Sequence, residues 1–135
     1  MAANPSFAAT PNIGAALLGS AETDLQSPAQ TSTIVTAGTN GTRIEEIVVQ
    51  ASKSGSLIAS TVAGLVYVFT YDGTNYRLYD IFTVNAITAS ATVAGFRFNK
   101  PYTNLVLKSG WSLRCSQSIA GNASILEVTG HGADL

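Results

Sequence analysis

The stretch Trp111-Ser112-Leu113-Arg114-Cys115-Ser116-Gln117-Ser118-Ile119 decides the fold class, because apolar and polar residues alternate along most of it. A period of two is typical of a β-strand with one face against a core, since successive side chains point to opposite faces. The alternation therefore predicts a strand in which Trp111, Leu113, Cys115 and Ile119 point inward.

Other strand-like segments surround this one from Thr31 onward, each bounded by turn residues, and no segment has a convincing helical period. They are predicted at 31–36, 42–51, 64–71, 76–84, 92–98, 105–107 and 124–129. Asp72-Gly73, between two aromatic-rich segments, is the strongest hairpin signal in the chain. About eight short strands with turns at about ten-residue intervals predict an all-β fold, and we expect a jelly-roll-type antiparallel β-sandwich.

The segment 42–51 contains a break in its period of two. Ile44 and Ile47 are three positions apart, whereas Val49 and Ala51 continue the regular alternation. A β-bulge near Glu45-Glu46 would restore the register, so we expect one there.

Three further expectations concern which way side chains point and where strands end. The segment 76–84 is predicted to place Tyr76, Leu78, Phe82 and Val84 on one face, with Asp80 as the exception. Phe96 and Phe98 are predicted to share a buried face of segment 92–98. Pro101 is predicted to end that segment, because proline cannot donate to a strand ladder.

Residues 1–30 differ from the rest of the chain. Pro5, Pro11 and Pro28 interrupt them, alanine and serine are frequent, and no period persists. We interpret them as an extended N-terminal arm that is disordered when free or ordered by a neighbour. Residues 31–135 are then the β-sandwich domain.

The segment 64–71 is apolar on both faces, and a strand of this kind is covered on both faces. One cover is the core, and the other is a candidate partner chain. The candidate subunit-interface residues are Leu65, Val66, Tyr67, Val68, Phe69 and Tyr71.

Composition limits the partners. Charged residues make up 11 % of the chain, against about 25 % in ordinary domains, and the formal net charge is -1. Nothing in this balance points to nucleic acid or an anionic membrane, and the low charge suggests that much of the surface meets other protein. Cys115 is the only cysteine, the N-terminus does not resemble a signal peptide, and no apolar run approaches the ~20 residues of a membrane span.

The search for chemistry finds no catalytic constellation. His131 is the only histidine and is interpreted as a solvated tail residue, and Cys115 as a packed small hydrophobe. The adjacent Glu45 and Glu46 should point to opposite faces of a strand, so they cannot flank one bond. We therefore expect no enzyme activity, no cofactor and no metal site.

Four tyrosines gather around one predicted hairpin, namely Tyr67, Tyr71, Tyr76 and Tyr79. Cross-strand tyrosine pairs stabilise sheets, so packing within the sheet or subunit contact is the favoured interpretation. An exposed aromatic strip that stacks on sugar rings is the alternative.

Several stretches together resemble small virion proteins of tailed bacteriophages and prophages, of the capsid decoration or cement type. The stretches are TAGTNGTRI at 36–44, IVVQA at 47–51, AGLVYVF at 63–69, YDGTNYRL at 71–78, LKSGWSL at 107–113 and VTGHGADL at 128–135. The resemblance extends over most of residues 31–135, and its elements are mainly turns and strand edges.

The resemblance implies a non-enzymatic protein on the capsid surface of a virion assembled in the host cytoplasm. It would bind the assembled head and bridge neighbouring subunits of the major capsid protein. The resemblance also implies a place at or near the abundant three-fold positions of an icosahedral shell. Together with the low charge, the apolar segment 64–71 and the N-terminal arm, this leads us to expect a homotrimer. A tail, baseplate or fibre-associated virion protein is the first alternative function, and a carbohydrate-binding module is the second.

Overall fold

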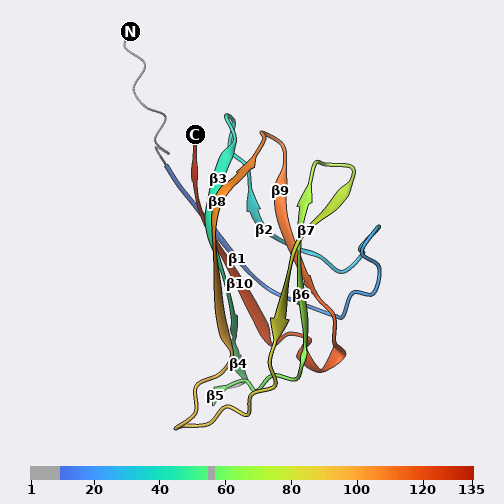
Figure 1. Cartoon of the computed structure of the whole chain (residues 1–135), viewed down its shortest axis with the longest axis vertical. Helices are drawn as coiled ribbons and strands as arrows, with labels where there is room; N and C mark the ends of the chain where they lie inside the picture. Colours follow the sequence, from blue (N-terminus) through green and yellow to red (C-terminus); the bar gives the residue numbers. More distant parts are fainter. Residues whose placement is uncertain (1–9, 55–56) are drawn as a thin grey trace.

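The computed structural model describes residues 10–54 and 57–135, and strands dominate this part of the chain (Figure 1). Sheet A has the strand order β1 (Thr10–Leu17), β10 (Leu126–Asp134), β3 (Thr42–Ala51), β8 (Arg97–Leu107). Sheet B has the order β2 (Ser32–Thr36), β9 (Ser112–Gln117), β6 (Gly64–Tyr71), β7 (Tyr76–Val84). The short strands β4 (Lys53–Ser54) and β5 (Leu57–Ile58) pair with each other, and the helical part of the described residues is one 3-10 turn, Ala120–Asn122.

The core lies between the two sheets. Its fully buried side chains include Ile47 and Val49 of β3, Val68 of β6, and Leu113 and Cys115 of β9. Adjacent strands of both four-stranded sheets pair antiparallel. The predicted all-β antiparallel sandwich is therefore confirmed, while its jelly-roll character stays a prediction.

The predicted bulge in β3 is confirmed. The pairing of β3 with β8 shifts register between Ile44 and Glu46, and the pairing with β10 shifts between His131 and Gly132. The bulge lets Ile44 and Ile47 both point into the core, where both are fully buried.

The prediction that Pro101 ends a strand is wrong. The predicted segments 92–98 and 105–107 are replaced by one strand, β8, which pairs Pro101 with Glu46 and Leu105 with Ile44. Proline is tolerated there because β8 is an edge strand and the position adjoins a bulge.

Two expected core residues are also placed differently. Phe96 is buried, but Phe98 lies on an edge strand and is 39 % exposed. Ile119 follows the end of β9 and is exposed, while Trp111 is partly buried against the core.

The side chains of β7 do not share one face as expected. The pairing of β6 with β7 shifts register, so that Val68 faces Asp80 but Phe69 faces Leu78. Tyr79 is the extra residue of this bulge. Phe82 and Val84 consequently point into the core, whereas Tyr76 and Leu78 lie on the outer face of sheet B.

The predicted boundary at residue 30 is wrong from residue 10 onward, and residues 1–9 of the predicted arm lie outside the described residues. Strand β1 pairs with β10 without a register shift, from Thr10 with Asp134 to Leu17 with Glu127. Leu18 is in the core, and Ala21 bridges to Gln117 of β9. This strand was hard to predict from the sequence because β1 carries small residues on its core side. Alternate residues of β1 therefore differ little in hydropathy, and the period of two is weak.

Candidate interaction surface

The residues of the predicted interface on β6 fall into a buried group and a partly exposed group. Val66 and Val68 are fully buried between the sheets. Phe69 points to the outer face of sheet B, yet it is also fully buried, with its ring centroid 6.4 Å from that of Tyr67 and 5.9 Å from that of Tyr76. Val66, Val68 and Phe69 therefore cannot contact a partner in the folded chain, and the prediction is wrong for them. Leu65, Tyr67 and Tyr71 are half-buried, so they remain candidates.

The tyrosine cluster is largely occupied by its own contacts. The ring centroids of Tyr71 and Tyr76 are 4.3 Å apart, and the Arg114 guanidinium carbon is 4.3 Å from the Tyr71 centroid. Arg114 Nη1 also donates to the Tyr76 hydroxyl at 3.0 Å. Tyr79 does not belong to this group, because its ring packs against Tyr102, 5.7 Å away between centroids. Packing within the sheet therefore accounts for most of the aromatic pattern.

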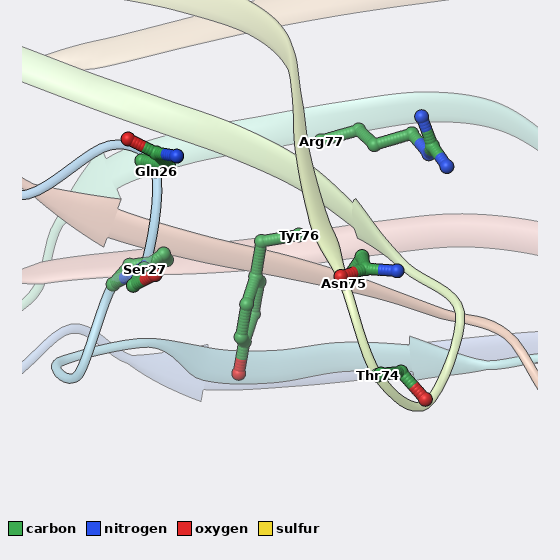
Figure 2. Close-up of a pocket in the computed structure, with 7 residues that line it drawn as sticks. Gln26, Ser27, Thr74, Asn75, Tyr76 and Arg77 are labelled. Carbon is green, nitrogen blue, oxygen red and sulfur yellow. The ribbon is translucent and has the colours of Figure 1, made fainter.

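A shallow polar pocket of about 410 Å³ lies beside this cluster, between the segment 26–28 and residues 74–77. Figure 2 shows the ring of Tyr76 standing between Ser27 and Asn75, while Arg77 extends away from the 26–27 loop. The pocket offers hydroxyl, carboxamide and guanidinium groups and no carboxylate, so it lacks the paired acids of a glycoside hydrolase.

A second cavity, of about 570 Å³, lies between the edge strands β7 and β8, and we call it the β7–β8 groove. Its apolar wall includes Phe82, Phe96 and Phe98, and its charged lining residues are Asp80, Arg97 and Lys100. It has a neighbouring hollow of about 310 Å³ that shares Gly95, Phe96 and Arg97 with it and continues to Ile58.

One hydrogen bond orders the wall of this groove. The Tyr102 hydroxyl donates to Asp80 Oδ2 at 3.0 Å. Burial raises the pKa of Tyr102 well above its usual value, and the hydrogen bond to Asp80 raises it further. Tyr102 therefore stays a neutral hydrogen-bond donor to the carboxylate.

Three segments at one end of the sandwich contain no charged residue, and we call them together the uncharged end; Lys53 of β4 adjoins them, because it pairs with Ile58. It consists of residues 57–63, 85–96 and 118–125, none of which is Asp, Glu, Lys, Arg or His. Figure 1 shows these connections gathered at the bottom of the sandwich, beyond the ends of the long strands. Exposed fractions between 39 % and 68 % are found there for Leu57, Ile58, Val62, Val93 and Ile119.

The uncharged end is held in shape by polar groups that point inward. Asn122 is almost fully buried, accepts from the Val62 backbone N–H at 2.9 Å and donates to the Val62 carbonyl at 2.9 Å. Thr61 pairs with Ile87 and donates from its hydroxyl to the Asn85 carbonyl at 2.7 Å. The apolar side chains are thus presented on ordered backbone, which lowers the entropy lost on binding.

The period of two does not reveal this end, because that pattern is confined to the strands. A usable signal was present in the spacing of charges. No charged residue occurs in the runs 54–71, 81–96 and 115–126, and each run contains one of the three segments. Lys53 precedes the first of these runs, so the gap in charge begins directly after it.

The residues considered for catalysis are separated from one another. Cys115 is fully buried, and burial raises the pKa of its thiol far above the usual value. His131 is not in a solvated tail as predicted, because it lies half-buried in β10 between Ile13 and Glu46. Within residues 10–54 and 57–135, no three His, Cys, Asp or Glu side chains are grouped so as to hold a metal ion.

Comparison of the chain with family models, with curated proteins and with solved structures finds no match. In the described part of the chain, no helix is long and apolar enough to cross a membrane.

Proposed function

We propose that this chain is a non-enzymatic virion protein of a tailed bacteriophage, a capsid decoration protein that binds the assembled head and bridges major capsid subunits. The observation that carries the proposal is the uncharged end. Five exposed apolar side chains at this end, with no charge among the 27 residues of its three segments, favour contact with another protein over contact with water.

The connectivity supports the expected type of scaffold. The first long strand pairs with the last, β2 pairs with β9, β3 with β8, and β6 with β7, all antiparallel. This nested pairing is what a jelly roll requires, because such a fold is one long antiparallel ribbon wrapped into two sheets. A sandwich of this kind is a stiff support on which end loops can be presented to a shell.

Low charge also suits a protein present in many copies. Neighbouring copies on a shell repel each other little when the net charge is -1. Weak contacts at each copy then suffice, because capsid symmetry repeats them. The homotrimer expected from the sequence relied in part on Val66, Val68 and Phe69, which are buried within the chain, so the proposal rests on capsid binding alone.

The alternatives have less support. A tail, baseplate or fibre component could use the same uncharged end, so the position on the particle separates it from a decoration protein. A carbohydrate-binding module would need free ring faces at Tyr71 and Tyr76, but these rings pack on each other and Arg114 packs on Tyr71. Glycan binding that is lost in Tyr76→Ala would revive that alternative.

Cryo-electron microscopy of the phage particle tests the proposal. We expect density for the sandwich on the outside of the head, over junctions between major capsid subunits, with the uncharged end toward the shell. Density confined to the tail, or absence of the chain from purified particles, would contradict it.

A variant pair tests the role of the end itself. Val62→Asp with Ile119→Asp should weaken binding to heads about a hundredfold or more, because each change places an unpaired charge in the contact. Thr74→Asp, at the opposite end of the sandwich, is the matched control and should bind as the wild type does. Both variants should keep the wild-type melting temperature within a few degrees, since the changed side chains are exposed.

A further inference from the structure

The two lateral sides of the sandwich are closed to different degrees. On the β1–β2 side the backbones approach so closely that a Cβ added at Gly14 would lie against the Ile34 carbonyl oxygen. On the other side, the edge strands β7 and β8 are separated by the β7–β8 groove. A groove between two unpaired strand edges is a place where an extended peptide can add to a sheet.

The backbone of β8 has hydrogen-bonding groups directed to this open side. The Ala51 N–H donates to the Phe96 carbonyl at 2.8 Å, so Phe96 bonds toward β3. Because these directions alternate along an antiparallel strand, the N–H and C=O groups of Arg97 and Asn99 point away from β3. Pro101, which has no N–H, falls in the same alternation, as expected for the free side of an edge strand.

The side chains of the groove define the chemistry of an occupant. Phe98, which is 39 % exposed, is the aromatic ring open to an occupant, whereas Phe82, with its ring centroid 5.3 Å from that of Phe98, and Phe96 line the groove as buried core residues. Arg97 and Lys100 line the β8 side. No salt bridge is found for either cation among the described residues, while the one carboxylate of the groove, Asp80, already accepts from Tyr102 and from the Ile81 N–H. The groove therefore fits a carboxylate better than a cation.

We propose that the β7–β8 groove binds an extended segment of the capsid protein, with one apolar side chain against the exposed ring of Phe98 and acidic side chains beside Arg97 and Lys100. The segment adds to the free edge of β8. This inference rests on the proposed function and names the part of the partner that is recognised. The groove continues through Phe96 to Ile58 of the uncharged end, so one partner can occupy both surfaces.

Photo-crosslinking on intact heads tests the groove. The full chain carrying p-benzoylphenylalanine in place of Phe98 is bound to heads, irradiated and digested, and the crosslinked peptide is identified by mass spectrometry. We expect one capsid segment that contains an acidic residue close to the crosslinked position. The same probe in place of Val106, an exposed apolar residue of β8 that does not line the groove, should give little crosslinking.

Charge reversal provides the second measurement. Arg97→Glu with Lys100→Glu should weaken head binding at least tenfold, and binding by the wild type should fall as salt is raised. Lys108→Glu, in the turn before β9, should leave binding unchanged. If the wild type binds heads but the double variant binds equally well, or the crosslinks at positions 98 and 106 are equal, the groove inference is wrong while the proposed function stands. If the wild type does not bind heads at all, both fail.

Discussion

The two lateral sides of the sandwich differ in how they are fastened. On the β1–β2 side, Asn12 Nδ2 donates to the Thr36 carbonyl at 2.9 Å and to Asp134 Oδ1 at 2.8 Å, and Gly14 lets the strands approach closely. On the β7–β8 side, the Tyr102–Asp80 hydrogen bond and the Phe82–Phe98 contact join the edges across an open groove. One side is therefore tightly packed, whereas the other leaves Phe98, Arg97 and Lys100 exposed.

The core between the two sides sets the largest expected effect. Leu113→Ala should lower the free energy of unfolding by about 2–5 kcal/mol, because it leaves a cavity at a fully buried position. Urea denaturation followed by circular dichroism measures the loss. If the two sides belong to one cooperative unit, hydrogen exchange should accelerate equally in β1 and β8. A loss below about 1 kcal/mol would mean that the core tolerates the cavity, and faster exchange on one side alone would mean that the sides unfold separately.

The closed side is tested next, by a single methyl group. Gly14→Ala should destabilise the chain by about 1–3 kcal/mol, because the new Cβ would collide with the backbone of Ile34 and force β1 from β2. Gly19→Ala is the matched control, since nothing lies within 4 Å of a Cβ added there. Thermal unfolding of both variants measures the difference. Equal melting temperatures would show that β1 and β2 can move apart without loss of stability. Their close backbone contact would then not be needed for the fold.

The contrast between the sides marks the limit of what the sequence could predict. The β-sandwich, the strand at 42–51 with its bulge and the hairpin at Asp72-Gly73 follow from local patterns of two to ten residues. Strand β1 does not, because Gly14 and Ala16 give its inner face almost no apolar signal and its place depends on β10, over a hundred residues away. The bulge at Tyr79 likewise depends on pairing with β6, so the faces of β7 could not be assigned from the alternation alone.

The candidate surfaces were hidden for a related reason. A strand that is apolar on both faces, such as Gly64–Tyr71, predicts that both faces are packed against other groups, but not which groups these are. On the outer face, Tyr67 and Tyr76 of the same sheet pack against Phe69. The uncharged end joins three segments that are far apart in the sequence, and the groove joins the edges of two sheets. Both arise only when the order of the strands is known.

A smaller effect is expected from the open side. Tyr102→Phe should cost about 0.5–1.5 kcal/mol of stability, because it removes the hydroxyl that donates to Asp80 while keeping the ring against the core. Chemical denaturation at neutral pH measures it. An unchanged free energy of unfolding would mean that this hydrogen bond does not stabilise the contact between β7 and β8. The Phe82–Phe98 contact would then be the main link between these two edges.

The smallest expected effect is a loss of stability at acid pH. The Thr42 hydroxyl, donating at 2.6 Å, and the Asn12 carboxamide hold the pKa of Asp134 below its usual value of 3.8. A carboxyl with a lowered folded pKa adds stability above its unfolded pKa, and this stability is lost as pH falls through the folded pKa. Urea midpoints measured from about pH 5 down to about pH 2 should therefore decline, and Asp134→Asn should decline less steeply. Asp72, whose pKa is also lowered, by the backbone N–H groups of Asn75 and Thr74, leaves a residual slope in that variant. Identical slopes for the wild type and Asp134→Asn would show that the Asn12–Thr42–Asp134 contact does not fasten the closed side through its charge.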